Sequence, residues 1–411
     1  MREMKVCVGG AILLALALAS PGVVPAAAGD RRAAPAVHLA EGPGGSGPIA
    51  GLRAPERRRI IGGGPIPVGE APWQVAVDIA PGWADGNAHR RQICGGSLVA
   101  PALVITAAHC VADERGRFRS PAERFSVVSG RTVLSSGSGV ETGVSEYYYF
   151  VDGSDRPVYN PRSSAWDVVL LELSGPAAGT PIKLAGPSEV DAWEVGRAAQ
   201  VSGWGSTKGP KGPYPDGLRA ASVVVLPDSQ CSDYFGRLAR TSFCAGTALG
   251  TEGTCFGHSG GPIAVPVSGG EMRLVGDTSY GTAGRCGTYI PSAYGKLAAE
   301  PMRSSLQAAA LEIAGTDIVG SGGVPPASMT PAQARENAWI YVIDDCRRWR
   351  PCRAVTARPC RRAGGGYRCK VIEYARKRRS RIRCGRRVSV SASSTAVVRR
   401  GIGKWRCRRS R

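Results

Sequence analysis

Short apolar runs separated by turn residues recur from Ile60 to about Gly315, and they limit the possible fold more than any other feature. Runs of strand length at such spacing indicate an all-β sandwich or barrel. One helical stretch closes the region, because Leu306, Ala309 and Ile313 follow one another at helical spacing. The strand-like runs are "WQVAVDI", "SLVAPALVITAAH", "RFSVVSG", "DVVLLEL", "AAQVSGWG", "ASVVVL" and "MRLVGDTSY".

The amino terminus reads "MREMKVCVGGAILLALALASPGVVPAAAG", with early positive charge, an apolar run and a small-residue end. This order predicts a signal peptide over residues 1–28, cleaved after Ala28. A membrane anchor is the alternative, but the apolar run is too short to span a bilayer comfortably. We therefore expect a secreted, extracellular protein with no transmembrane anchor after cleavage. A second form of this hypothesis has the secreted protein retained at the cell surface.

Cysteine usage agrees with export. Loss of Cys7 with the signal peptide leaves twelve of the 13 cysteines, an even number that predicts disulfides in an exported chain. Residues 29–59 are rich in Gly, Pro, Ala and Arg and predict a disordered pro-segment that ends in an exposed Arg run. Residues 316–335 predict a Gly/Pro/Ser linker between the β-rich domain, 60–315, and a tail, 336–411.

The tail carries the positive charge of the protein. From Tyr341 to Arg411 the chain holds 24 of its 53 Lys and Arg but three of its 32 acids, so the first 340 residues are neutral. Alternating segments and six cysteines predict a small disulfide-stapled β module. Six cysteines allow 15 pairings, and no pairing follows from the sequence. These cysteines are Cys346, Cys352, Cys360, Cys369, Cys384 and Cys407.

Such a basic module suggests binding to anionic polymers at the cell surface through charge neutralisation. The alternative is a solvated module whose aromatic residues form its own core, and "RKRRSR" (376–381) is a site where the tail can be trimmed. No motif indicates specific nucleic-acid binding. The tail has no Cys-x-x-Cys pair and no His, which argues against a metal site.

Three residues of the β-rich domain suggest nucleophilic acyl transfer. This chemistry needs a nucleophile, a base, a group that orients the base and donors for the oxyanion. "LVITAAHC" places His109 at the end of an apolar strand, and "SAWDVVLLEL" places Asp167 at the start of another, where a buried charge wants a donor. "GHSGGP" surrounds Ser259 with glycines that let backbone N–H groups turn toward a substrate.

The region 60–315 resembles the chymotrypsin/trypsin-like serine protease family. The resemblance rests on "RIIGGG", "CGGSLV", "TAAHC", "WDVVLLEL", "VSGWG", "FCAG", "GHSGGP" and "SYG", in family order. It implies two six-stranded antiparallel β-barrels with a C-terminal helix, and the small β module follows as an addition. It also implies a secreted serine endopeptidase, synthesised as a zymogen, that acts as a monomer on protein or peptide substrates without a cofactor or metal.

The same resemblance implies the residue roles. His109 is the general base and acid, Asp167 orients it, and Ser259 is the nucleophile. The N–H groups of Gly257 and Ser259 form the oxyanion hole, and Ser279–Gly281 pairs with the substrate backbone. The implied disulfides are Cys94–Cys110, Cys231–Cys244 and Cys255–Cys286.

The specificity pocket departs from that of trypsin. Gly253 stands at its floor, where a trypsin-like enzyme has an Asp, and Gly281 and Ser292 form its walls. An uncharged P1 residue is therefore expected, unless the loop alignment is shifted by one residue. Because such a pocket does not suit Arg, the Arg59–Ile60 activation bond is expected to be cut by another protease.

His258 replaces the Asp that pairs, in the family, with the ammonium released by activation. A buried ammonium without a counter-charge is costly, and three interpretations follow. The enzyme is active because another contact, such as a His258–Asp277 pair, orders the loop; or it is active only conditionally, with pH; or the chain is a protease-fold binding protein with little or no activity.

Overall fold

A computed structural model describes the chain in several segments and includes nearly all of the β-rich domain. The described residues are 38–41, 63–207, 213–247, 253–281, 290–321, 331, 334–335, 337–339, 352–357, 360–363, 366–377, 380–392 and 397–410. The predicted signal peptide, most of the pro-segment, Arg59, Ile60 and Cys286 lie outside them. Among the described residues, no helix is long and apolar enough to cross a membrane.

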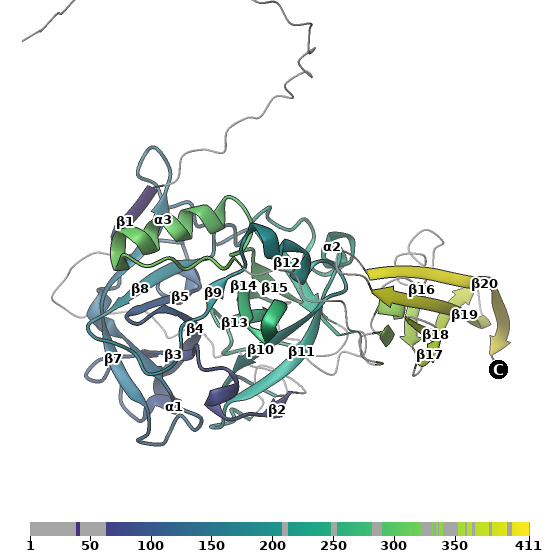
Figure 1. Ribbon diagram of the computed structural model, residues 1–411, viewed down its shortest axis with the longest axis horizontal. Coiled ribbons are helices and arrows are strands. Elements are labelled where there is room, and N and C mark those ends of the chain that lie inside the picture. Colours follow the sequence, from purple (N-terminus) through teal and green to yellow (C-terminus); the bar gives the residue numbers. More distant parts are fainter. Residues whose placement is uncertain are drawn as a thin grey trace, which may run out of the picture. The chain divides into compact units, whose positions relative to one another are not determined.

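Two closed antiparallel barrels form the β-rich domain (Figure 1). The first has the strand order β7-β6-β3-β4-β5-β8 and closes through β7–β8, and the second has the order β10-β13-β14-β15-β12-β11 and closes through β10–β11. The all-β class, the six-stranded barrels and the closing helix are therefore confirmed. The first-barrel strands are β3 (Gln74–Ile79), β4 (Gln92–Ala100), β5 (Leu103–Thr106), β6 (Phe125–Ser129), β7 (Val140–Val151) and β8 (Val169–Leu173). The second-barrel strands are β10 (Ala198–Gly203), β11 (Arg219–Val225), β12 (Ser242–Gly246), β13 (Pro262–Pro266), β14 (Met272–Tyr280) and β15 (Ser292–Gly295).

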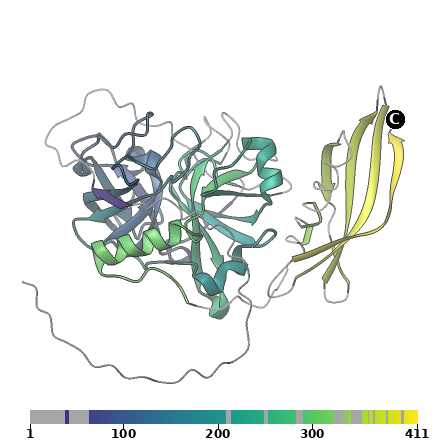
Figure 2. The same cartoon turned by 90° about the horizontal axis from the view of Figure 1, so that it is seen from above.

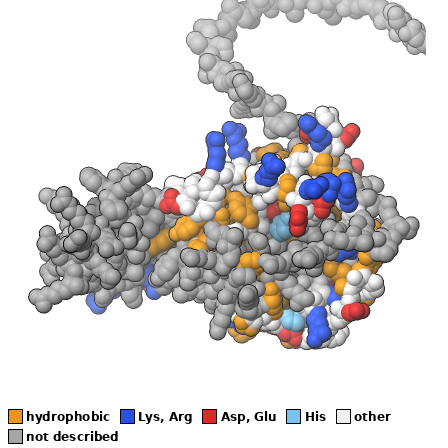
Figure 3. Space-filling view, turned by 180° about the vertical axis from the view of Figure 1, so that it is seen from behind, with side chains coloured by type: hydrophobic (Ala, Val, Ile, Leu, Met, Phe, Trp, Pro, Cys, Tyr) orange, Lys and Arg blue, Asp and Glu red, His pale blue; other side chains and the backbone are white. Residues whose placement is uncertain are grey.

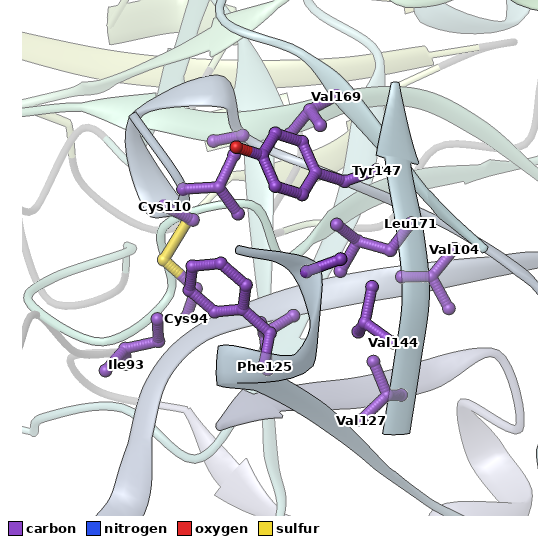
Figure 4. Close-up of a cluster of buried hydrophobic side chains, with 14 of the residues drawn as sticks. Ile93, Cys94, Val104, Cys110, Phe125, Val127, Val144, Tyr147, Val169 and Leu171 are labelled. Atoms are coloured by element: carbon purple, nitrogen blue, oxygen red, sulfur yellow. A yellow bond between two sulfur atoms is a disulfide. The ribbon is translucent and has the colours of Figure 1, made fainter. Parts of the chain in front are cut away.

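Each barrel is filled by β-branched and aromatic side chains, which suit a pleated surface with one buried face. In the first barrel they gather around the Cys94–Cys110 disulfide (Figure 4). Tyr147, fully buried, donates from its hydroxyl to the Ser120 carbonyl oxygen at 2.8 Å, so its one polar group is satisfied. The second disulfide of the described domain, Cys231–Cys244, joins α2 (Asp228–Phe235) to β12. Both pairings are those expected from the resemblance.

Helix α3 (Met302–Ala314) packs against both barrels. It begins after Pro301 and ends at Gly315, whose left-handed conformation (φ 59°) caps the last carbonyl groups. Its buried face, including Met302 and Leu306, belongs to one cluster with side chains of β5, β8 and β14. The remaining short elements are α1 (Ala88–Arg91) and the 3-10 turns Val68–Glu70, Ala108–Cys110, Ala122–Arg124, Pro187–Trp193 and Ser268–Gly270.

Three short strands extend the barrels. They are β1 (His38–Glu41), which pairs with β7, β2 (Gly64–Pro65), which pairs with β11, and β9 (Lys183–Leu184), which pairs with β14. The strand β1 differs from the expectation of a wholly disordered pro-segment. The edge of β7 explains it, because unpaired backbone groups there accept an extended segment whatever its side-chain pattern.

The predicted linker also begins with packed residues. Leu184 donates its N–H to the Ile318 carbonyl at 2.7 Å, and Gly320 donates to the Leu184 carbonyl at 2.8 Å. Ile318 is completely buried in the cluster that holds α3. A Gly/Ser-rich stretch thus continues the domain, because its backbone extends the edge of β9.

The tail forms a sheet of its own, whose long strands lie side by side in Figure 2. Its order is β16-β18-β19-β20, with β17 also paired to β18. The disulfide Cys360–Cys369 crosses from the start of β17 to β18. The strands are β16 (Cys352–Ala357), β17 (Arg361–Ala363), β18 (Gly366–Lys377), β19 (Ser380–Ala392) and β20 (Val397–Ser410).

Strand register predicts a further disulfide in this sheet. Cys384 of β19 stands directly opposite Cys407 of β20 in the antiparallel pair. Directly opposite residues have Cα atoms about 4.5–5.5 Å apart, which is within the range that a disulfide spans. We expect peptide mapping of the unreduced protein to recover the Cys384–Cys407 pair, and mapping that links either residue to Cys346 or Cys352 would contradict this register.

Candidate active site

His109 lies in the 3-10 turn Ala108–Cys110, directly after strand β5. The four residues of β5 are all buried, so the chain leaves the barrel interior where the strand ends. The Cys94–Cys110 disulfide fastens this turn to β4. The imidazole is therefore held on a rigid strand end, with its side chain 26% exposed.

Asp167 lies just before β8, and its side chain is 1% exposed. Its Oδ1 accepts the backbone N–H of His109 at 2.9 Å, and its Oδ2 lies 2.8 Å from His109 Nδ1. Ser279 Oγ, on β14 of the second barrel, donates to the same Oδ2 at 2.5 Å. Because the carboxylate holds a proton on Nδ1, the Nε2 atom of neutral His109 is left as the basic nitrogen.

The Ser259 loop packs closely against the segment that carries His109. Gly95 of β4 donates its N–H to the Ser259 carbonyl at 2.8 Å. The next residue, Gly260, has φ +75°, and a Cβ there would lie 2.0 Å from Thr106 Oγ1 and 2.7 Å from the Ala107 nitrogen. Only glycine permits this approach, which brings the "SGGP" backbone beside the strand end of His109.

Two backbone donors of this loop are available to a ligand. Among the described residues, the N–H groups of Gly257 and Ser259 donate to no protein acceptor. Buried backbone donors are rarely left without a partner unless a ligand or water takes them. This is the arrangement expected of an oxyanion hole.

A cavity of about 770 Å³ opens beside His109. Its lining includes Cys110, the charged turn that follows His109, and Tyr159. In that turn Asp113 accepts from Arg117 Nε at 2.7 Å, so the two charges hold the loop in shape. Burial raises the pKa of the Tyr159 hydroxyl, and the Asp167 charge raises it further.

The residues expected to form the specificity pocket are only partly described. Gly253 is buried, Gly281 is exposed, and Ser292 donates from Oγ to the Thr254 carbonyl at 3.0 Å. Residues 248–252 and 282–289, which would complete the pocket, lie outside the described residues. Cys255 is disulfide-bonded, but its expected partner, Cys286, is among the residues not described.

His258 is 1% exposed and lies against the "GWG" backbone of the second barrel. Gly205 donates its N–H to His258 Nε2 at 3.3 Å. A Cβ on Gly203 would lie 2.6 Å from His258 Cδ2, so the ring fills the space that glycine leaves. An Nε2 that accepts a hydrogen bond carries no proton, and this imidazole is therefore neutral in the structure.

Asp277 does not pair with His258. It is fully buried on β14, and a Cβ on Gly295 would lie 2.3 Å from its Oδ1. Neither of its carboxylate oxygens accepts a well-formed hydrogen bond from the described residues. Burial raises the pKa of this carboxyl well above its usual value, and the nearby charge of Asp167 raises it further. The suggested His258–Asp277 pair is thus absent, and Asp277 is a buried acid behind Asp167 and Ser279.

These observations define a class of protein: two closed β-barrels that hold a His–Asp pair beside a Gly-x-Ser-Gly-Gly loop, which is the trypsin-like fold. The family model described as Trypsin matches residues 60–299, more than half of the chain. The chain therefore belongs to the chymotrypsin/trypsin-like serine protease family.

Two relatives found by sequence agree with this membership. Trypsin of Saccharopolyspora erythraea is 35% identical over 223 residues, which cover 54% of this chain and 86% of that protein. Glucanase inhibitor protein 1 of Phytophthora infestans is 31% identical over 254 residues, which cover 61% and 88%. A solved structure of neuropsin, a serine protease expressed in the limbic system of mouse brain, is 29% identical, with coverage of 58% and 95% and a TM-score of 0.46.

The buried carboxyl of Asp277 predicts a pH-dependent stability. Its raised pKa lets it keep its proton in the folded protein to a higher pH than in the unfolded chain, where it ionises above about 3.8. Between these two pKa values the folded state binds the extra proton, so its stability falls as pH rises, by at most about 1.4 kcal/mol per pH unit. Asp277→Asn removes this loss, and we expect the variant to gain stability relative to the parent between pH 4 and pH 7.

Urea unfolding at both pH values, with Ser259→Ala in all chains to prevent self-cleavage, measures the effect. Asp152→Asn is the control: the hydrogen bond from the Arg156 side chain lowers the pKa of Asp152, so this carboxyl titrates below the tested window. Its stability difference from the parent should therefore stay nearly constant between pH 4 and pH 7. An Asp277→Asn difference that does not change with pH would contradict a protonated Asp277.

Proposed function

We propose that the protein is a secreted serine endopeptidase with His109, Asp167 and Ser259 as its triad. One observation carries this proposal: the Asp167 carboxylate accepts both from His109 and from Ser279 Oγ, which fixes the imidazole with Nε2 as the base. An intact His–Asp pair is needed for catalysis, but a binding protein has no reason to keep it. Family membership of the domain supports the same reaction class.

The proposed reaction uses these residues in turn. His109 Nε2 takes the Ser259 hydroxyl proton as Oγ attacks the scissile carbonyl, and Asp167 stabilises the imidazolium that forms. The N–H groups of Gly257 and Ser259 donate to the oxyanion of the tetrahedral intermediate. The imidazolium then gives its proton to the leaving amine, and water hydrolyses the acyl-enzyme by the same steps in reverse.

Substrate choice and activation are further parts of the proposal. Gly253 offers no charge to a basic P1 side chain, so we propose an uncharged P1 residue. Cleavage of Arg59–Ile60 by another protease would release the mature chain. The domain would act as a monomer outside the cell, without a metal or cofactor.

A protease-fold binding protein is the second candidate. Two observations favour it: His258 stands in place of the activating Asp, and one relative is named a glucanase inhibitor rather than a protease. In that case the site would hold a protein partner without cutting it. The two candidates differ in whether Ser259 is nucleophilic.

Labelling with a fluorophosphonate probe separates them. We expect the chain cut at Arg59–Ile60 to be labelled on Ser259, and Ser259→Ala to abolish labelling, with Ser305→Ala on α3 as the matched control. Asp167→Asn should lower kcat by about 10⁴-fold, because the imidazole loses the partner that fixes its tautomer. No labelling of the correctly cut parent chain would rule out the endopeptidase and favour the binding protein.

The neutral His258 predicts how the oxyanion loop is held. If its acceptor bond from Gly205 orders the loop, His258→Gln, whose Oε1 accepts the same N–H, should retain most of kcat/KM. His258→Leu leaves the buried Gly205 donor without a partner, which costs about 1–3 kcal/mol, so kcat/KM should fall about 5- to 150-fold with P1 preference unchanged. Equal activity of the Leu and Gln variants would show that this bond does not order the loop.

A further inference from the structure

The C-terminal sheet separates most of its described side chains into two faces; the exceptions are Ile372, buried on the same face as Lys370, and Arg362, exposed opposite Tyr367. Antiparallel register places Tyr367 opposite Val390 and Cys369 opposite Val388, and these four residues are buried. The alternate positions of the same strands, together with β17, carry Arg361, Arg368, Lys370 and Arg387, all exposed. We call these four residues the cationic face.

The register also sets like charges side by side on this face. Arg361 stands directly opposite Arg368, and Lys370 stands directly opposite Arg387. Ser389 lies opposite Arg368, and Arg400 of β20 takes the register position opposite Ser389. Like charges at directly opposed positions destabilise a sheet, so this arrangement opposes the folding of the module.

No carboxylate offsets these charges among the tail residues whose side chains the structure describes. The protease domain is different, since acidic and basic side chains lie interspersed on the described surface of the face in Figure 3. A surface whose only task is solubility mixes both signs. The cationic face is therefore better explained by an anionic ligand than by solvation.

The opposite, apolar face is already used inside the molecule. Its residues form one buried cluster with Trp339 and with Leu226 of the second barrel. Asn337, fully buried, donates from Nδ2 to the Gly196 carbonyl at 2.9 Å, which ties the segment before the sheet to the protease domain. The cationic face is thus the side of the sheet that remains for a partner.

The cationic face is also rigid. The Cys360–Cys369 disulfide joins the residue before Arg361 to the residue after Arg368. Two guanidinium groups are therefore fixed near each other before any ligand arrives, which lowers the entropy cost of binding. The described cationic face presents no aromatic side chain, and the adjacent Tyr367 ring is buried on the other side, so it offers no platform on which nucleic-acid bases stack.

We propose that this face is a binding site for a linear anionic polysaccharide, whose closely spaced sulfate, phosphate or carboxylate groups would pair with the four cations. The site would hold the protease at a polyanionic surface. The inference goes beyond the proposed endopeptidase activity and does not depend on it.

Heparin, used as the probe, tests the site in the full-length chain with Ser259→Ala. We expect the variant R361Q/R368Q/K370Q/R387Q to bind heparin at least about tenfold more weakly at 0.15 M salt, because counterion release scales with the number of paired cations. The slope of log Kd against log salt concentration should become shallower by about three, because four paired cations are removed. The control R162Q/K183Q/R237Q/R240Q removes the same charge from exposed positions of the protease domain, and its Kd should change less than twofold.

A variant that adds a charge should bind more tightly, and misfolding cannot produce that result. Ser389→Lys adds a cation between Arg368 and the register position of Arg400, and it should bind heparin more tightly than the parent. Equal weakening by the two quadruple variants would show that net charge alone matters, and would overturn the site. Tighter binding to single-stranded DNA or to phosphatidylglycerol vesicles than to heparin, at equal charge concentration, would overturn the ligand class.

Discussion

The buried Asp167 carboxylate is the interaction on which the arrangement of the two barrels depends. A charge that is 1% exposed is costly unless donors surround it. Two of its donors come from His109 of the first barrel and one from Ser279 of the second. Because donors from both barrels meet on one carboxylate, the barrels can pack in few other ways without leaving that charge unsatisfied. The orientation of the His109 imidazole and one contact between the barrels thus depend on the same three hydrogen bonds.

Much of this was predictable from the sequence, because the determinants are local. The apolar runs predicted the strands, and the ends of those runs predicted where His109 and Asp167 lie. The glycines next to Ser259 indicated a close approach of the backbone. The Ser279–Asp167 bond was missed, since the sequence suggested only a substrate-binding strand there. Counting acceptors would have pointed to it: a buried carboxylate has more lone pairs than one imidazole can satisfy. Strand β1 was missed for the opposite reason, because edge pairing uses backbone groups that leave no side-chain pattern.

His258 and Asp277 illustrate how two residues that are unusual for the family can be accommodated without pairing with each other. Sequence reasoning joined them because an acid and an imidazole, each unusual for the family, invite pairing. In the structure each is accommodated separately: the imidazole accepts a backbone N–H in space left by Gly203, and burial behind Asp167 raises the pKa of the Asp277 carboxyl. Neutral groups need fewer partners than charged ones when buried. At position 258 the chain therefore has an imidazole that accepts a backbone N–H from Gly205, where the family has an acidic side chain.

The tail shows which properties follow from amino-acid composition and which require the strand register. Composition located the excess of Arg and Lys in residues 341–411, but it did not tell an evenly solvated module from a directional one. Register decides this, because a period of two sends alternate residues to opposite faces. Buried side chains at Tyr367, Cys369, Val388 and Val390 fill one side of the sheet at these positions, and four described cations lie on the other side. At these positions the same alternation therefore provides both a buried cluster and a cationic surface.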